Sequence, residues 1–375
     1  MRPLRLPLAT VAFALAALTP LLAACTGGAG TQGASTVDRS AAIGPPRATP
    51  SAAPAAATAT ATATLPEPDA TAAPVRSLDF EWRDALRDRV VPVRLYLPDT
   101  GAATPAAPAP LPLVVFSHGL GGSRAGYSHL GRHWAARGIA SLHLQHAGSD
   151  RAVWTDGSAF GLPERLRSAA STANAVARAR DVSFALDRLL GEPALAARID
   201  PERIAVAGHS YGANTALLVA GARFEREDGP GTLRDARVRA VVLMSAPPFP
   251  ARFDPRDVLA GITIPALHLT TVDDVISVPG FRSVAQDRIA LYDAMAARPK
   301  WLAVFAFGTH GVFTDRGADA GSQAIKRATR DLSTAFLRTV LNARPGALER
   351  AFDAHASLLA APSSTWGAPR IGLPD

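Results

Sequence analysis

The stretch Arg203-Ile-Ala-Val-Ala-Gly-His-Ser-Tyr-Gly-Ala-Asn-Thr-Ala-Leu-Leu218 joins two opposite patterns of side chains. Its first five residues favour a buried β-strand, and the residues from Ala213 onward favour a helix. Between them lies the turn Gly208-His-Ser-Tyr-Gly212. A turn this sharp needs residues without bulk on either side of its centre, which the two glycines supply. The stretch therefore predicts a strand, a turn and a helix in direct succession.

The same alternation of apolar runs and amphipathic segments continues along most of the chain. It predicts an α/β fold, a mainly parallel sheet with helices on both faces. Pro92 lacks an amide donor, which predicts that the first strand lies at an edge of the sheet. The expected strands are 90–97, 113–117, 139–145, 203–207, 238–244, 266–270 and 301–307, and the expected helices are 127–137, 165–190, 211–222, 284–297 and 322–341.

Gly-x-Ser-x-Gly between a strand and a helix is a pattern typical of a serine nucleophile. A serine hydroxyl needs a base, and the base needs an orienting carboxylate. In this architecture the chain order is serine, then an acid after a later strand, then histidine after the last strand. We therefore predict Ser210 as nucleophile, His310 as general base and Asp273 as the orienting acid. Asp274 is the alternative, because a shift of one residue at the strand end would exchange the two carboxylates.

The run Val114-Val-Phe-Ser-His-Gly-Leu-Gly-Gly-Ser123 follows an early predicted strand with a glycine-rich loop. An oxyanion formed during attack by serine needs two hydrogen-bond donors. The His118-Gly119 pair and the turn at Ser210 point to the backbone amides of Leu120 and Tyr211. No lysine follows the glycines, so a phosphate-binding P-loop is excluded, and we predict no cofactor.

Three segments together resemble a known group of α/β hydrolases. They are Val-Val-Phe-Ser-His-Gly-Leu-Gly-Gly-Ser-Arg, Gly-His-Ser-Tyr-Gly and Gly-Thr-His-Gly-Val-Phe, and the similarity spans roughly residues 80 to 340. The group contains the platelet-activating-factor acetylhydrolases and bacterial predicted dienelactone hydrolases. The resemblance implies the triad of Ser210, Asp273 and His310 and the oxyanion donors Leu120 and Tyr211.

Two departures from that group limit what the resemblance implies about substrate. Many relatives have a second glycine where this chain has Ala213, which removes no catalytic atom. True dienelactone hydrolases use a cysteine nucleophile, whereas the turn here holds Ser210. The predicted triad indicates a serine hydrolase acting on a small-molecule carboxylic ester. A lipid-type or polyester-type substrate suits an enzyme tethered at the cell surface, and acyl transfer is a further possibility. The alternative from a different class is a non-catalytic envelope lipoprotein that binds an apolar ligand or a partner.

Other histidines and aromatic residues invite weaker interpretations. The pairs His129/His133 and His143/His146 lack a third ligand at a suggestive spacing, so we predict no metal site. The segment 148–172 is long enough to form a partial lid, and Trp154 and Phe160 are candidates for the rim of the site.

The N-terminus pairs basic residues with an interrupted apolar run that ends in Leu22-Ala-Ala-Cys25. This pattern resembles the lipobox of bacterial lipoproteins and predicts a signal peptide over 1–24, lipidation of Cys25 and attachment to a membrane of the bacterial envelope. An ordinary secretory signal with an incidental cysteine is the alternative. Cys25 is the one cysteine of the 375 residues, which excludes an internal disulfide.

The remaining composition predicts the domain organisation. Residues 25–74 are dominated by Ala, Thr and Pro and predict a disordered tether. We expect the catalytic domain over 75–345 and a C-terminal extension over 346–375. The net charge of +7 comes from arginines that are spread along the chain and mixed with 32 acidic residues, so we predict no nucleic-acid partner. The oligomeric state is left open.

Overall fold

The computed structural model describes residues 73–99, 109–226, 229–250, 252–278, 281–360 and 371–372. The predicted signal peptide, Cys25 and the predicted tether up to residue 72 lie outside these ranges. No helix within the described ranges is long and apolar enough to span a bilayer.

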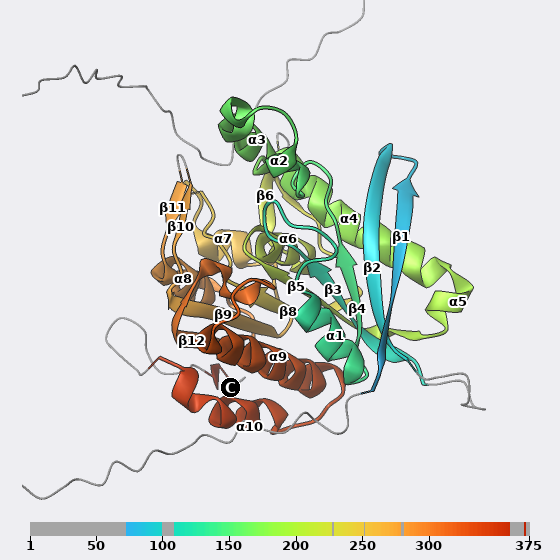
Figure 1. The fold of residues 1–375 in the computed structure, drawn as a ribbon, viewed down its shortest axis with the longest axis vertical. Helices are drawn as coiled ribbons and strands as arrows, with labels where there is room; N and C mark the ends of the chain where they lie inside the picture. Colours follow the sequence, from blue (N-terminus) through green and yellow to red (C-terminus); the bar gives the residue numbers. More distant parts are fainter. Residues whose placement is uncertain are drawn as a thin grey trace, which may run out of the picture. The chain divides into compact units, whose positions relative to one another are not determined.

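A nine-stranded sheet with the order β1-β2-β4-β3-β5-β8-β9-β12-β13 forms the centre of the fold (Figure 1). The six strands from β4 to β12 run parallel, and β1, β2 and β13 pair antiparallel with their neighbours. The strands are β1 (Val75–Asp84), β2 (Arg89–Pro98), β3 (Leu111–Ser117), β4 (Ala140–Leu144), β5 (Ile199–His209), β8 (Val238–Met244), β9 (Ala266–Asp273), β12 (Lys300–Thr309) and β13 (Ile371–Gly372).

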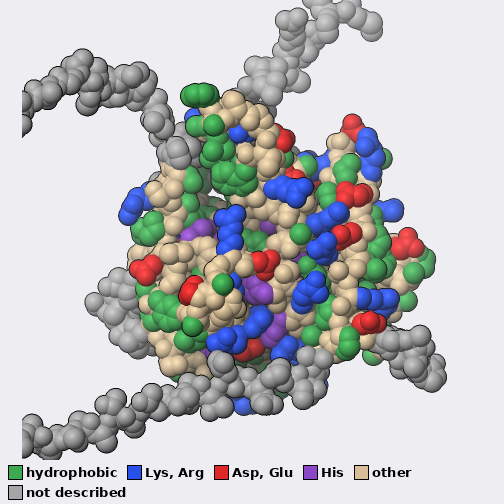
Figure 2. All heavy atoms as spheres, in the orientation of Figure 1, with side chains coloured by type: hydrophobic (Ala, Val, Ile, Leu, Met, Phe, Trp, Pro, Cys, Tyr) green, Lys and Arg blue, Asp and Glu red, His purple; other side chains and the backbone are tan. Residues whose placement is uncertain are grey.

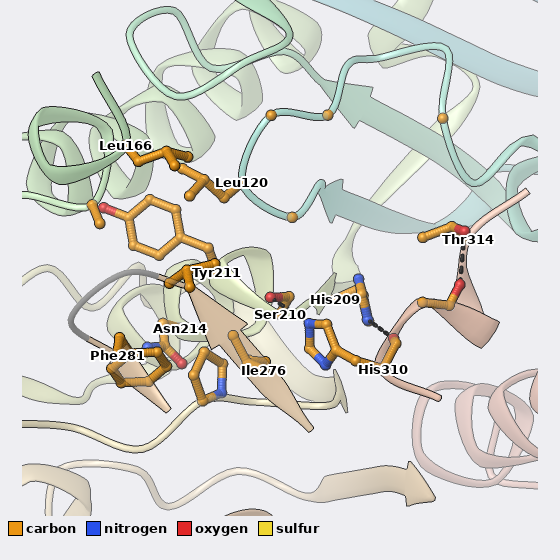
Figure 3. A pocket seen from close by; sticks show the side chains of 18 of the residues that line it. Leu120, Leu166, His209, Ser210, Tyr211, Asn214, Ile276, Phe281, His310 and Thr314 are labelled. Carbon is orange, nitrogen blue, oxygen red and sulfur yellow. Dashed lines mark hydrogen bonds between the residues drawn. The ribbon is translucent and has the colours of Figure 1, made fainter. Parts of the chain in front are cut away.

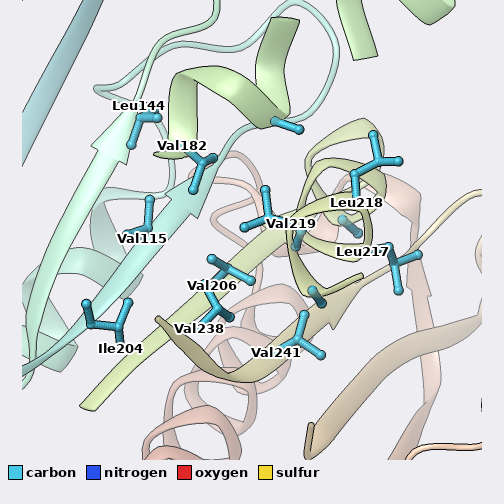
Figure 4. Packing of buried hydrophobic residues seen from close by; sticks show 14 of the residues in the cluster. Val115, Leu144, Val182, Ile204, Val206, Leu217, Leu218, Val219, Val238 and Val241 are labelled. Carbon is cyan, nitrogen blue, oxygen red and sulfur yellow. The ribbon is translucent and has the colours of Figure 1, made fainter. Parts of the chain in front are cut away.

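Helices cover both faces of this sheet, and the alternation of side chains along each strand explains why. In β3, Leu113 and Val115 join one buried cluster with residues of α4 (Thr172–Gly191) and α6 (Tyr211–Ala220) (Figure 4). Val114 and Phe116 join another cluster with residues of α1 (Ser128–Ala136) and α9 (Ala320–Leu341). Because successive side chains of a strand point to opposite faces, a strand that is apolar throughout needs a cover on each side. The predicted α/β class is therefore confirmed.

Long helices such as α4 and α9 pack on the sheet, whereas the short helices α2 (Ala152–Thr155) and α3 (Leu162–Ala169) lie beyond its carboxyl edge (Figure 1). The helices vary in length from 4 to 22 residues. They are α1 (Ser128–Ala136), α2 (Ala152–Thr155), α3 (Leu162–Ala169), α4 (Thr172–Gly191), α5 (Pro193–Ala196), α6 (Tyr211–Ala220), α7 (Pro255–Leu259), α8 (Ala285–Ala294), α9 (Ala320–Leu341) and α10 (Ala347–Ala354). Single 3₁₀ turns are η1 (Ala159–Gly161), η2 (His310–Phe313) and η3 (Ala356–Leu358), and two small hairpins pair β6 (Arg223–Arg226) with β7 (Gly229–Thr232) and β10 (Ile276–Val278) with β11 (Phe281–Ser283).

The prediction that Pro92 lies in an edge strand is wrong, because β1 pairs with β2 on its outer side. Pro92 is tolerated there. Its carbonyl faces β4 and accepts a hydrogen bond from the backbone N–H of Gln145, just beyond the end of β4. Pro92 has no backbone N–H to donate, but the hydrogen-bond ladder between β2 and β4 ends next to it, at Val93 and Leu144. β1 itself was not predicted, although Leu78, Phe80 and Trp82 alternate with polar residues in the way that a half-exposed strand requires.

The helix expected over 165–190 is two helices, because the chain breaks at residues 170 and 171. The Ser171 hydroxyl oxygen accepts a hydrogen bond from the backbone N–H of Asn174 and so caps the start of α4. An N-cap of this kind satisfies one of the free amides at a helix start, so it favours a new helix over a continuous one.

The segment after residue 345, which was expected to be an extension, packs on the domain. Leu348 and Phe352 of α10 are buried in the same cluster as α9. Farther on, Ile371 and Gly372 pair with β12. The described part of this segment thus belongs to the folded core.

Candidate active site

Ser210 lies between β5 and α6, with a backbone φ of 55° and ψ of −126°. A residue other than glycine rarely adopts a positive φ, so contacts with the surrounding structure must stabilise this backbone conformation. A Cβ atom on Gly208 would collide with the backbone of Gly212, and one on Gly212 would collide with the Ser117 carbonyl. The two glycines let the strand, the turn and β3 pack closely, which places the Ser210 hydroxyl at the carboxyl edge of the sheet.

His310 is the first residue after β12 and reaches the serine from the neighbouring loop (Figure 3). Its Nε2 lies 2.9 Å from Ser210 Oγ, and its Nδ1 lies 2.7 Å from Asp274 Oδ1. The structure thus brings together the predicted Ser210 and His310 with a carboxylate. In this order a histidine can take the hydroxyl proton at Nε2 while the carboxylate holds the Nδ1–H.

The expectation that Asp273 orients His310 is wrong, because Asp274 makes this hydrogen bond. Asp273 is the last residue of β9 and its side chain is exposed. The Asp274 amide donates to the Thr271 carbonyl over 3.3 Å, so the chain turns directly after the strand. This turn directs the Asp274 carboxylate inward, toward His310.

Asp274 is fully buried, and each of its oxygens has a donor. Oδ1 faces His310, and Oδ2 accepts from Thr270 Oγ1 over 2.7 Å. The Arg288 Nε lies 3.4 Å from Oδ2. Burial by itself raises the pKa of Asp274, but the hydrogen bond with His310 and the charge of Arg288 outweigh it and hold the pKa well below its usual range. Asp274 is therefore an anion at neutral pH.

Leu120 and Tyr211 line the same cavity as Ser210, and their backbone amides have no acceptor among the described residues. The neighbouring loop amides are occupied, since Gly119 donates to Tyr127 Oη and Gly121 donates to the Ser149 carbonyl. Two free donors beside the nucleophile are what a developing oxyanion requires. The structure thus leaves the two predicted donors available for this role.

A chain of buried hydrogen bonds connects the loop of His310 with the loop of Leu120. His209 Nε2 donates to the His310 carbonyl over 2.9 Å, and Tyr127 Oη lies 2.8 Å from His209 Nδ1. The Tyr127 oxygen in turn accepts from the Gly119 amide over 3.3 Å. Burial lowers the pKa of His209 to about 3, so the ring stays neutral, with Nε2 as donor and Nδ1 as acceptor.

Arg178 of α4 supports the same loop from behind and is fully buried. It donates to the His118 carbonyl and to the hydroxyls of Ser117 and Thr215. Its guanidinium also lies 4.5 Å from the centre of the Tyr211 ring. Sequence reasoning missed both Arg178 and Tyr127. A charged residue on the apolar face of a helix was a usable signal for Arg178, whereas nothing local marks Tyr127.

A cavity of about 1050 Å³ opens above Ser210. Its lining is mostly apolar and includes Phe249. Leu120, Ile276 and Phe281 also line it and are labelled in Figure 3. This combination of apolar walls and a few polar groups is typical of a small-molecule site. On the face shown in Figure 2, hydrophobic side chains gather around a hollow in which histidine side chains are visible.

The segment 148–172 lies beside this cavity, as expected for a partial lid. Trp154 and Leu166 line it, and Trp154 Nε1 donates to the Gly121 carbonyl over 3.1 Å. Phe160 is 98% exposed and is not part of the lining, so its prediction as a rim residue is wrong.

The remaining histidine pairs lie against other protein groups. His129 Nε2 lies 3.0 Å from the Phe313 carbonyl, and His133 Nε2 lies 3.6 Å from Asp331. His143 contacts the Gly126 carbonyl, and His146 lies between Ser117 and Asp181. Within the described ranges, no cluster of three His, Cys, Asp or Glu side chains could hold a metal ion.

Comparisons with known proteins agree with this architecture. Residues 93–157 match the sequence model of the family described as platelet-activating factor acetylhydrolase, isoform II. This match covers the loop of Leu120 but not Ser210, Asp274 or His310. No curated protein matches the chain.

Two solved structures are similar over most of the chain. A ferulic acid esterase from Streptomyces cinnamoneus has 24% identity and a TM-score of 0.55, covering 80% of this chain and 96% of its own. A cold-adapted esterase from an Arctic intertidal metagenomic library has 18% identity and a TM-score of 0.49, covering 73% and 97%. The first likeness, together with the strand order and the turn at Ser210, shows that the chain has the α/β-hydrolase fold.

Proposed function

We propose that the protein is a serine hydrolase that cleaves carboxylic esters. The observation that carries this proposal is the continuous line from Ser210 Oγ through His310 to Asp274, with distances of 2.9 and 2.7 Å. A buried anion, a histidine and a half-buried serine that lines a cavity have one well-understood use in this geometry, the activation of the hydroxyl as a nucleophile. The partial family match and the esterase neighbours support the same chemistry.

The reaction follows from the positions of these groups. Ser210 Oγ attacks the ester carbonyl while His310 Nε2 takes its proton, and the carbonyl oxygen becomes an anion that the amides of Leu120 and Tyr211 stabilise. When the tetrahedral species collapses, the bond to the alcohol oxygen breaks and His310 returns its proton to the leaving alcohol. A water molecule then attacks the acyl-enzyme with His310 again as base, which releases the acid and restores Ser210. An alcohol in place of water would give acyl transfer.

The cavity supports a substrate with apolar parts. Its apolar lining and its size favour a lipid-type or polyester-type ester over a small hydrophilic one. The partial match to the acetylhydrolase family favours a short acyl group.

Labelling with a fluorophosphonate probe tests this function directly. We expect one equivalent of label on Ser210, and loss of both label and 4-nitrophenyl butyrate hydrolysis in Ser210→Ala. Ser277→Ala is the matched control, because Ser277 is exposed and outside the cavity lining. The non-catalytic lipoprotein predicts no label in the wild type. Full hydrolysis by Ser210→Ala would overturn the proposal.

We further propose that the protein is exported and anchored to the bacterial cell envelope through lipid on Cys25. The position of the one cysteine after the apolar run supports this. Expression in a bacterium fed an alkyne fatty acid tests it. Wild type should carry the label and sediment with membranes, and Cys25→Ser should do neither. A wild-type protein without label in the soluble exported fraction would support the ordinary secretory signal instead.

A further inference from the structure

Three arginines from separate segments line the cavity above Ser210. Arg151 precedes α2, Arg282 lies in β11, and Arg316 follows η2. All three side chains are exposed, so their guanidinium groups remain hydrated and charged. They come from separate parts of the chain, and only the fold places them along one cavity.

None of these arginines has an acidic partner within the part of the chain that the structure describes. This distinguishes them from arginines such as Arg89 and Arg237, which bind aspartates at 2.6 to 2.8 Å. The cavity has one carboxylate in its lining, Asp315. Its oxygens accept from the backbone amides of Ser128 and His129 over 3.0 and 3.3 Å, and among the described residues no ion pair joins Asp315 to any of the three arginines.

The lining therefore has an excess of positive charge. Counting the arginine and aspartate side chains of the lining, three arginines against one aspartate give 3 − 1 = +2. A concave site with apolar walls concentrates the field of such charges and raises the local concentration of anions. The planar guanidinium group also matches the geometry of carboxylate and phosphate oxygens.

We infer that the cavity selects esters that bear an oxyanion, a carboxylate or a phosphate, on the arm away from the scissile bond. Arg151, Arg282 and Arg316 act as specificity-determining residues that bind this group while the apolar walls hold the rest of the chain. The inference rests on the proposed ester hydrolysis at Ser210 and names the substrate class of that site.

A matched pair of substrates tests the inference. Mono-4-nitrophenyl adipate carries a free carboxylate, and methyl 4-nitrophenyl adipate has the same chain without the charge. After correction for their uncatalysed rates, we expect kcat/KM to favour the anionic ester about tenfold at low ionic strength. The preference should decline toward one at about 1 M NaCl, where screening acts over a few ångströms.

Single variants locate the effect. Arg151→Gln, Arg282→Gln and Arg316→Gln should each lower the preference about two- to fivefold, as expected for exposed ion pairs. The effect of each variant is read from the ratio of kcat/KM for the anionic ester to kcat/KM for the neutral ester, so that a general change in activity does not enter it. Arg76→Gln is the matched control, because it removes the same charge from an exposed position. Arg76 lies in β1, outside the cavity lining.

Competitive inhibition of neutral-ester hydrolysis separates the two oxyanions. Glutarate and inorganic phosphate are the probes, and the one that binds more tightly to wild type identifies the preferred group. Equal rates for the two adipate esters, or a preference that persists in the triple Gln variant, would overturn the inference. Failure of the proposed function is a different result, since neutral-ester hydrolysis would then survive in Ser210→Ala.

Discussion

The adjacent residues Asp273 and Asp274 differ in their surroundings, and only Asp274 is placed to orient His310. Asp274 contacts His310, Thr270 and Arg288, whereas Asp273 faces solvent at the end of β9. Asp274→Asn should lower kcat by about 10⁴-fold, because an amide cannot stabilise the imidazolium and favours the wrong tautomer.

Asp273→Asn is the control for this change and should leave kcat within about twofold of wild type. Steady-state kinetics with 4-nitrophenyl butyrate measures both variants. A large loss in Asp273→Asn with an active Asp274→Asn would show that the two carboxylates have been assigned in the wrong order.

The hydroxyl of Tyr127 is the second residue-scale feature with a measurable consequence. It lies between the Gly119 amide and the His209 ring, so it fixes the loop that carries the Leu120 amide. Tyr127→Phe should lower kcat about tenfold with little change in KM, because a displaced oxyanion donor matters mainly in the transition state.

Tyr292→Phe removes a hydroxyl from another buried tyrosine that is not in the cavity lining. It should leave kcat unchanged. Binding of a trifluoromethyl ketone, which forms an oxyanion on Ser210, should weaken in Tyr127→Phe by the same factor as kcat. A fall in thermal stability with unaltered ketone affinity would indicate a structural role alone.

At the scale of elements, α10 shows how far the folded domain extends. Leu348 is fully buried against α9, while Leu86, in the turn between β1 and β2, is fully exposed. Leu348→Ala should cost about 2–5 kcal/mol in the free energy of unfolding. Leu86→Ala should change it by less than about 0.5 kcal/mol.

Urea unfolding monitored by circular dichroism measures both leucine variants. If Leu348→Ala were as stable as wild type, the contact of α10 with α9 would contribute little to the stability of the domain. The sequence predicted only an extension after residue 345, and even a recognised amphipathic pattern would indicate only that a helix has an apolar face. It does not show which surface covers that face.

At the scale of the whole molecule, buried neutral histidines couple stability to pH. Burial lowers the pKa of His143 and of His268 to about 3, and that of His146 to about 4. In the unfolded chain these side chains take up protons near pH 6.5. The unfolded state therefore binds more protons between about pH 6.5 and 4, so stability should fall as the pH is lowered through this range.

The midpoint of urea unfolding, measured from pH 7.5 to 4.5, should decline steeply below pH 6.5. His268→Phe should reduce this decline, since it removes one buried titrating group and keeps an aromatic ring against Tyr292. A midpoint that is flat down to pH 5 would contradict the neutral, buried state of these histidines.

Local patterns were sufficient for the parts of this protein that depend on near neighbours in the chain. Alternating apolar strands and amphipathic helices indicated the α/β class, and the glycines around Ser210 indicated its turn, because backbone sterics act within a few residues. The order of Ser210, a carboxylate and His310 followed from the connectivity of such a sheet.

Only the tertiary structure decided which side chains meet across the sheet. The turn after β9 selected Asp274 over Asp273, and packing brought Tyr127, His209 and Gly119 into one chain of hydrogen bonds. Likewise, three arginines far apart in the sequence came to surround one cavity. Contacts of this kind depend on how whole elements pack, and no periodicity within a single segment encodes the position of its distant partner.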